Sequence, residues 1–163
     1  MGNRLSKMVG KINCAPKFMR PWLYTKLFCS QVKYANTTGI RITKLDKDQV
    51  EIELANKKKI QNHIGGVHAI AAALLAESAT GIVFGINLPD SQLPLLKSMK
   101  IDFLRRMEGG LKATASISTE QVQQIKGQDK GDLMIEVQIT DESGEEPIAC
   151  FMNWAWVTKR TKT

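Results

Sequence analysis

The sequence has little of what would indicate disulfides, a metal centre or a membrane span. Its three cysteines are widely spaced, with no C-x-x-C pair and no cluster with either histidine, so neither a disulfide framework nor a zinc site is expected. No segment approaches the roughly 20 uninterrupted apolar residues that a membrane span requires. We therefore expect a cytoplasmic protein with reduced thiols, no metal and no membrane span.

Acidic residues are absent from the beginning of the chain. Six basic residues precede residue 30 without one acid among them, namely Arg4, Lys7, Lys11, Lys17, Arg20 and Lys26. Such a block can contact nucleic acid or an anionic membrane surface, guide a phosphate-bearing ligand, or form a solvated helix face. Because no zinc knuckle, basic-region heptad or aromatic RNA-binding signature is present, we expect no nucleic-acid partner.

A chain of 163 residues suits one well-filled core with an extension at one end. Apolar residues near helical spacing, interrupted by two prolines, predict two short helices within residues 3–29. We assign residues 1–34 to an N-terminal helical extension packed on the domain, residues 35–158 to the domain itself and residues 159–163 to a basic tail.

The first half of the domain is predicted to contain a strand hairpin and a buried helix. Apolar and polar residues alternate over 38–45 and 49–55, with a turn at Asp46–Asp48 between them, which predicts a β-hairpin. The segment Asn62–Gly85 follows as a predicted helix, and within it Val67–Gly85 is apolar on every face. Such a helix needs cover on all sides, so we expect a sheet wrapped around it and a second subunit.

The second half is predicted to contain four strands. They are expected at 96–106, 110–119, 132–140 and 147–157. A loop that contains Pro89 and Pro94 precedes them. Gly109-Gly110 and Asp141–Gly144 are expected as hairpin turns, and Glu120–Lys130 as a longer polar loop. The fold class predicted is α+β.

Glu77 is the one formal charge in the predicted helix. An unpaired buried carboxylate is costly unless it is hydrogen-bonded or protonated, so Glu77 is a functional candidate; the alternative is a structural carboxylate that meets a lysine or an amide. Its helical row is otherwise small and leaves a shallow groove beside the carboxylate. The row comprises Ala69, Ala73, Glu77, Gly81 and Gly85. We take Ala73 and Gly81 as substrate-binding positions.

His68 lies nine residues before Glu77. On a helix this spacing places the two on opposite faces, about 13 Å apart along the axis, so they cannot form a dyad within one chain. Taken alone, His68 is more often a capping residue than a catalyst. The amide N–H groups after it are unpaired at a helix start and suit the polarisation of a carbonyl group.

A family resemblance rests on the segments around these residues. Asn62–Ala69 (NHIGGVHA) and Leu75–Glu77 (LAE) resemble the Asn…Gly…His-Gly-Gly…Leu-Ala-Asp signature of hotdog-fold acyl-CoA thioesterases of the phenylacetyl-CoA type. Ile101–Arg106 and Gly109–Ala113 resemble that family's third strand and hairpin. The resemblance covers about residues 35–158 and is closer still to an uncharacterised branch that carries Asn-His-x-Gly-x-x-His-Ala.

The resemblance implies a six-stranded antiparallel sheet wrapped around a central helix, in a homodimer or a dimer of dimers with active sites at the interface. It implies that Glu77 is the base or nucleophile and that the amide of Ala69 is the oxyanion donor. His68 would be a positioning group, and Asn62 would orient water or the thioester. The family's paired glycines are replaced by Ala69 and Ile70, which favours a non-catalytic binding module as the alternative.

The resemblance implies a coenzyme A thioester as substrate, with no cofactor. A coenzyme A site usually has Lys or Arg at its mouth, and Arg105 and Arg106 are candidates; the alternative is that both are solvent-facing residues at a strand end. Gly65 and Gly66 are taken as further substrate-binding positions. We expect hydrolysis of an acyl-CoA or related thioester, with acyl-chain binding without turnover, or hydration or dehydration of an acyl thioester, as alternatives.

Overall fold

The structure is a computed structural model that describes residues 2–159. The elements in chain order are α1 (Arg4–Ile12), α2 (Arg20–Gln31), α3 (Lys33–Thr38), β1 (Arg41–Leu45), β2 (Gln49–Leu54), η1 (Lys58–Ile60), α4 (Ala69–Asn87), β3 (Gln92–Phe103), β4 (Leu111–Ser116), α5 (Thr119–Gly127), β5 (Gly131–Asp141) and β6 (Ile148–Thr158). Of the predicted basic tail, residues 160–163 lie outside the described part of the chain.

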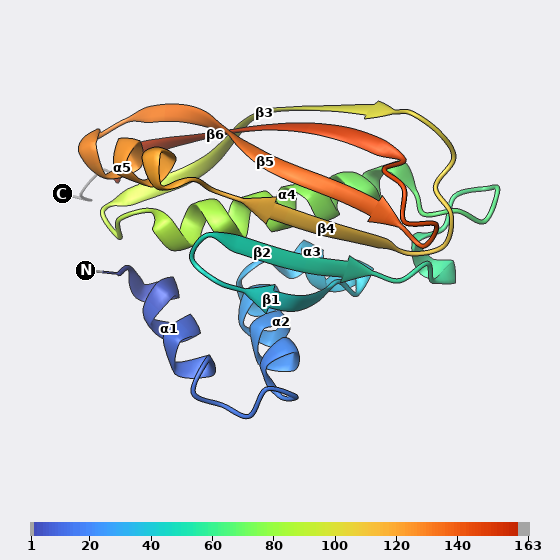
Figure 1. Ribbon diagram of the computed structural model, residues 1–163, viewed down its shortest axis with the longest axis horizontal. Coiled ribbons are helices and arrows are strands. Elements are labelled where there is room, and N and C mark those ends of the chain that lie inside the picture. The colour runs from blue at the N-terminus through green and yellow to red at the C-terminus, as the bar shows by residue number, and fades with distance from the viewer. Residues whose placement is uncertain (1, 160–163) are drawn as a thin grey trace.

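The six strands form one antiparallel sheet in the order β1-β2-β4-β5-β6-β3. The sheet curves around α4, with β1 and β3 as its two edges, and α1 and α2 lie below β1 in this view (Figure 1). The predicted α+β fold, with a six-stranded sheet around a central helix and N-terminal helices, is confirmed.

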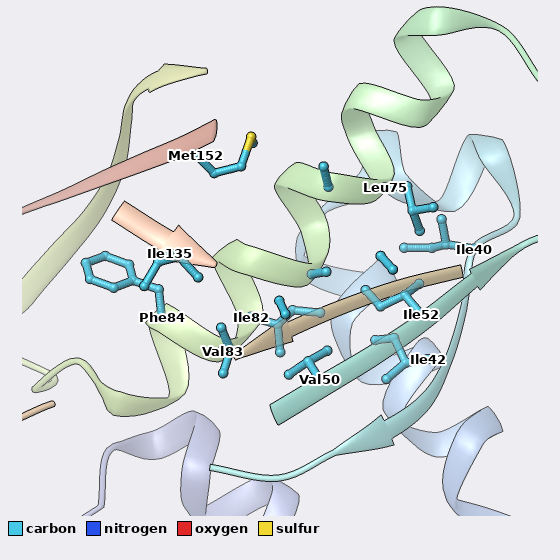
Figure 2. Packing of buried hydrophobic residues seen from close by; sticks show 14 of the residues in the cluster. Ile40, Ile42, Val50, Ile52, Leu75, Ile82, Val83, Phe84, Ile135 and Met152 are labelled. Atoms are coloured by element: carbon cyan, nitrogen blue, oxygen red, sulfur yellow. The ribbon is translucent and has the colours of Figure 1, made fainter. Parts of the chain in front are cut away.

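Helix α4 is the centre of the hydrophobic core. Leu75, Ile82 and Val83 point from it toward β1 and β2, while Phe84 lies near Ile135 (Figure 2). By length and composition α4 could cross a membrane, and it is the one such helix within residues 2–159. Its side chains are instead packed inside the domain, which explains why a helix can be apolar on every face.

The segment Asn62–Val67 does not belong to the helix, so this part of the predicted helix is wrong. It forms a tight loop in which the amide of Asn62 donates to the carbonyl of Gly66 over 2.9 Å. Gly65 has a φ of +79°, a left-handed conformation that interrupts helix formation and favours glycine. The helix begins at Ala69, after His68, and continues beyond the predicted end to Asn87.

Two further predictions fail in the second half of the domain. Gly109-Gly110 does not close a hairpin, because β3 pairs with β6 while β4 pairs with β2 and β5. Pro94 lies inside β3 rather than in a loop. Since β3 is an edge strand, proline's missing N–H removes no bond from the interior of the sheet. The predicted hairpins at Asp46–Asp48 and Asp141–Gly144 are confirmed by the β1–β2 and β5–β6 pairings.

The predicted polar loop Glu120–Lys130 contains a helix. α5 starts after Ser118, whose side chain accepts from the amide of Gln121, while the Gln121 side chain accepts from the amide of Ser118. This reciprocal capping box satisfies two amides that a helix start leaves unpaired. The polar composition therefore reflects a surface helix.

The N-terminal helices are attached to the domain by hydrogen bonds as well as by apolar packing. The Asn3 side chain accepts from the amide of Ser6 at the start of α1 and donates to the carbonyls of Gly85 and Leu88 at the end of α4. The Thr25 hydroxyl of α2 accepts from the amide of Ile42 in β1. α1 and α2 are the two helices expected from the sequence, while α3 was not expected there.

Candidate active site around Glu77

Glu77 lies in the middle of α4 with its side chain half-buried. Within the described residues, its carboxylate forms neither an ion pair nor a hydrogen bond, so it meets no lysine or amide as a structural carboxylate would. Burial raises the pKa of Glu77 above its usual value, because a low-dielectric environment disfavours the charged form. Glu77 is therefore a half-buried carboxylate without a protein partner among residues 2–159.

A cavity of about 520 Å³ lies beside Glu77. It is enclosed by α4 on one side and by the N-terminal helices on the other, with one residue each from β3 and β6. Its apolar wall includes Leu5, Met8, Leu27, Phe28, Ile82 and Trp154. This size and lining are typical of a small-molecule site for an apolar group.

Ser78 places a second polar group on the cavity wall. The side chain is only 4% exposed, and its hydroxyl has no hydrogen-bond partner among residues 2–159. Most buried hydroxyls in proteins are hydrogen-bonded, so an unpartnered one directly beside a cavity is unusual. Besides Ser78, the polar residues of the lining are Arg4, Gln31 and Glu77.

Gly81 and Gly85 shape the cavity in different ways. A Cβ atom on Gly81 would lie 2.9 Å from the Trp154 ring, so the glycine lets this indole pack directly on α4. The Trp154 indole also donates to the Thr80 hydroxyl over 2.9 Å, which fixes the ring as a cavity wall. A Cβ on Gly85 would meet nothing within 4 Å, so that position is open to the cavity.

The predicted row of small residues is therefore only partly a groove. Glu77, Gly81 and Gly85 line the cavity, whereas Ala69 and Ala73 do not. Ala73 is buried in the domain. Only the C-terminal half of the row lines the cavity.

His68 is the N-terminal cap of α4. Its Nδ1 accepts a hydrogen bond of 3.1 Å from the amide of Ile70, which satisfies one of the unpaired amides at the helix start. The amide of Ala69 finds no acceptor within the described chain. The predicted oxyanion donor is therefore free, and His68 holds the turn that presents it.

Asn62 shapes the loop before α4. Its Oδ1 accepts from the amides of Ile64 and Gly66, both at 3.1 Å. This is the local pattern by which an Asn side chain stabilises a tight turn. The predicted water- or thioester-orienting oxygen is thus already engaged, and Gly65 and Gly66 belong to the turn that it holds.

The two candidate arginines have structural partners. Arg105 forms an ion pair of 2.9 Å with Asp141 and donates to Ser143. Burial alone would raise the pKa of Asp141, but hydrogen bonds from Arg105, from the Ser143 hydroxyl and from two amides outweigh it and hold that pKa well below its usual range. Arg106 donates to the carbonyl of Ile64 and so braces the loop before α4.

The predicted site residues fall into two groups within one chain. Glu77 and Gly81 face the cavity, while Asn62, His68 and Ala69 lie at the start of α4, about 13 Å away along its axis. His68 lines a separate hollow with Tyr34 and Lys59. A single subunit does not bring the two groups together, and their meeting at a dimer interface stays a prediction.

Sequence reasoning did not find the contribution of the N-terminal helices to the site. The apolar positions Leu5, Met8, Leu27 and Phe28 follow helical spacing and indicated a buried face, but nothing in that spacing indicated what the face covers. Nothing in the sequence marked Ser78 as a residue of the site, because an isolated serine in a helix is common.

Three of the solved structures with similar folds illustrate the likeness. A Pseudomonas aeruginosa protein of unknown function, described as a probable thioesterase, is 24% identical and matches 82% of this chain and 92% of its own with a TM-score of 0.75. A Haemophilus influenzae thioesterase is 16% identical over 85% and 90% of the two chains, with a TM-score of 0.66. A thioesterase family protein from Silicibacter pomeroyi is 17% identical over 83% and 96%, with a TM-score of 0.64.

These likenesses confirm the hotdog fold that the sequence resemblance implied. A comparison with curated proteins gives no match to this chain. A family model described as "Domain of unknown function (DUF4442)" matches residues 20–157, and the chain therefore belongs to that family.

Proposed function

We propose that this protein hydrolyses a thioester of an apolar acyl group, with acyl-CoA as the expected substrate. The observation that carries the proposal is the unpartnered, half-buried carboxylate of Glu77 on the wall of an apolar cavity. Enzymes commonly raise the pKa of a catalytic glutamate by burial, because a base works best when its pKa approaches the working pH. The names of the similar structures support the same reaction class.

The chemistry needs one base and one oxyanion site. Glu77 accepts a proton from water as the water oxygen adds to the thioester carbon, which leaves a tetrahedral oxyanion. The free amide of Ala69, at the positive end of α4, stabilises that oxyanion. The C–S bond then breaks, the carbonyl reforms, and the thiolate takes up the proton from Glu77. If Glu77 is instead the nucleophile, its carboxylate adds to the thioester carbon, the C–S bond breaks and the thiolate leaves, and water then hydrolyses the acyl-enzyme anhydride and supplies the proton that the thiolate takes up.

The proposal requires two subunits, because Glu77 and Ala69 of one chain lie too far apart to act on one carbonyl. The edge strand β3 offers a surface for the second copy. Three of its apolar side chains, Leu93, Leu95 and Met99, are each more than 40% exposed. A long edge strand with exposed apolar side chains is a template for pairing with another strand. We propose a homodimer in which each Glu77 faces the helix start of the partner.

A thiol-release assay with acyl-CoAs of short, long and aromatic acyl groups tests the reaction. We expect turnover of at least one substrate and a loss of about 100-fold or more in kcat for Glu77→Gln, the usual contribution of a general base. The matched control is Glu136→Gln, since Glu136 is an exposed glutamate in β5. A Glu77→Gln variant with full turnover would exclude the mechanism.

One observation favours a second function, the binding of an acyl chain without turnover. The amide of Ile70 is already occupied by His68, which leaves fewer free donors at the helix start for an oxyanion. Under this alternative, acyl-CoA binds saturably to the protein and to Glu77→Gln alike, with no thiol released. Equilibrium binding measured beside thiol release separates the two functions.

A further inference from the structure

The turn between α1 and α2 projects from the domain on the side away from the sheet (Figure 1). It exposes two aromatic side chains, Phe18 at 84% and Trp22 at 59%, with Met19 between them at 39%. Trp22 lies in the first turn of α2, and the ammonium group of Lys26 sits 4.7 Å from the centroid of its ring. Exposed apolar side chains that gather at one place on a surface mark an interaction site.

The charge around this turn has one sign. Nine Lys and Arg residues and no Asp or Glu precede Asp46, whereas the other 118 residues carry 14 basic and 16 acidic side chains. Near the turn, Lys11, Lys17 and Lys26 form no ion pair within residues 2–159. Arg20 is held by a bond from its Nε to the carbonyl of Ala15.

The acid that approaches this region is Asp46, which lines a hollow together with Lys17, Arg20 and Lys44. Its carboxylate lies 3.8 Å from the ammonium group of Lys44. One carboxylate therefore does not neutralise the surrounding cations, and the end of the helical pair stays positively charged.

The sheet contains a second exposed aromatic ring that lies beneath a lysine, but the charge of that lysine is balanced by an acid. Phe151 is 47% exposed on β6 and lies under Lys100, with 5.3 Å between the ammonium and the ring centroid. There, however, Lys100 is paired with Asp102 at 2.6 Å. An exposed aromatic ring beneath a lysine thus occurs at both sites, but only the pair at Trp22 belongs to an unneutralised basic surface.

We propose that the end of the α1–α2 pair, residues Lys11–Lys26, docks on the surface of an anionic lipid bilayer. Phe18 and Trp22 enter the headgroup region, where amphipathic aromatic rings are favoured. The lysines and Arg20 contact lipid phosphates, each basic residue near the surface contributing about fivefold in affinity. The inference does not rest on the thioesterase reaction, because it uses neither Glu77 nor the cavity.

Trp22 provides a built-in probe of this docking. The other two tryptophans, Trp154 and Trp156, are buried in the core, so an emission shift on adding vesicles reports on Trp22. We expect a blue shift and co-sedimentation with vesicles of phosphatidylcholine and phosphatidylglycerol, weaker binding to phosphatidylcholine alone, and loss of binding at high salt. Absence of any shift with the anionic vesicles would overturn the proposal.

Variants test which surface is used. The double variant Phe18→Ser with Trp22→Ser, followed by sedimentation, should lose at least tenfold in affinity for anionic vesicles, and Lys17→Glu with Lys26→Glu should lose as much. Phe151→Ser is the matched control and should bind like the original protein; an equal loss there would overturn the proposal. All five positions are exposed, and thermal unfolding verifies that each variant folds.

Two further outcomes also count against docking on lipid. If the Trp22 emission shifts with protein concentration in the absence of vesicles, the surface is an interface between copies of this chain. If a DNA or RNA duplex removes the protein from anionic vesicles and itself produces the blue shift, the surface binds nucleic acid. The Glu77→Gln variant should bind vesicles normally, so failure of the docking and failure of the thioesterase proposal are distinguishable.

Discussion

Asp141 and Glu77 are two carboxylates with opposite surroundings: Asp141 is buried and hydrogen-bonded, whereas Glu77 is half-buried and has no protein partner among residues 2–159. Asp141, at the β5–β6 turn, accepts hydrogen bonds from Arg105, Ser143 and the amide of Glu108, and its pKa is depressed. Glu77 has no such partner within the described residues, and its pKa is raised. A carboxylate that the fold fully satisfies is part of the structure, whereas one that the fold leaves unsatisfied is a candidate for chemistry.

The largest effect expected from this comparison is a loss of stability in Asp141→Asn. The amide nitrogen cannot accept the bonds that the carboxylate accepts, and Arg105 loses its buried partner, so we expect the free energy of unfolding to fall by about 3 kcal/mol. Denaturant titration measures this. Glu108→Gln is the control, because its exposed ion pair with Arg105 spans 3.9 Å and contributes little.

Activity of the same variant provides the converse test. Well below its unfolding temperature, Asp141→Asn should retain the kcat/KM of the original protein, since Asp141 does not line the cavity. A folded Asp141→Asn variant without thioesterase activity would break the comparison and place Asp141 among the functional residues.

A smaller effect is expected when the cavity beside Glu77 is filled. A Cβ atom at position 85 would have no neighbour within 4 Å, and leucine has a higher helix propensity than glycine, so the Gly85→Leu variant should fold. The new side chain occupies the space of the distal acyl carbons, and we expect about a tenfold loss in kcat/KM for long acyl chains with short chains retained. Gly10→Leu, at an equally open position in α1 outside the cavity, is the control, and an unchanged chain-length profile in Gly85→Leu would contradict this use of the cavity.

Variants of His68 test whether the start of α4 only supports the fold, as Asp141 does, or also takes part in the reaction, as is proposed for Glu77. Removal of the cap in His68→Ala should cost about 1 kcal/mol of stability, measured by thermal unfolding. His68→Asn supplies another capping side chain and should restore both stability and most of the activity. If His68→Asn is stable but inactive in the thiol-release assay, the imidazole has a role beyond presentation of the Ala69 amide.

The smallest effect is a gain in stability for Glu77→Gln at neutral pH, of about 0.5 kcal/mol. Because the folded-state pKa of Glu77 is raised, its contribution to stability is fully present below the unfolded-state pKa and is lost as pH rises through the folded-state value. The variant should therefore gain stability relative to the original protein between mildly acidic and neutral pH and match it in acid. A loss of stability at neutral pH would mean that Glu77 has structural partners.

The pH dependence of stability that Asp141 contributes has the opposite sign to that of Glu77. Its depressed folded-state pKa contributes stability above the unfolded-state value, and this stability is lost as pH falls through the folded-state value. The difference in unfolding free energy between the original protein and Asp141→Asn should therefore shrink as pH falls below about 4. Urea titrations over a pH series measure both signs in one experiment.

Much of the fold could be predicted because it depends on local patterns. The alternation of apolar and polar residues predicted the strands, and a long segment rich in Ala and Leu predicted the buried helix. Two of the errors fell where the pairing of distant strands decides the outcome. Gly109-Gly110 has the sequence of a hairpin turn, but β3 pairs with β6 instead, and Pro94 is tolerated because β3 is then an edge strand.

The candidate site was predicted less completely. Glu77 stood out because a charge in an apolar helix is costly wherever that helix is buried. The capping role of His68 was a weaker expectation, and the engagement of the Asn62 side chain in the loop was not expected, since both depend on the exact start of α4. Arg105 resembled a phosphate-binding residue in sequence, but its ion pair with Asp141 joins residues 36 positions apart.

The sequence by itself determined the secondary-structure periodicities, the apolar helix with its single acid and the basic beginning of the chain, because these follow from neighbouring residues. Only the tertiary structure decided that α1 and α2 close a cavity over Glu77, that Ser78 is left without a partner, and that Asp141 is satisfied while Glu77 is not. Burial and hydrogen-bond partners depend on which distant segments meet, and those meetings set the pKa and the role of each carboxylate.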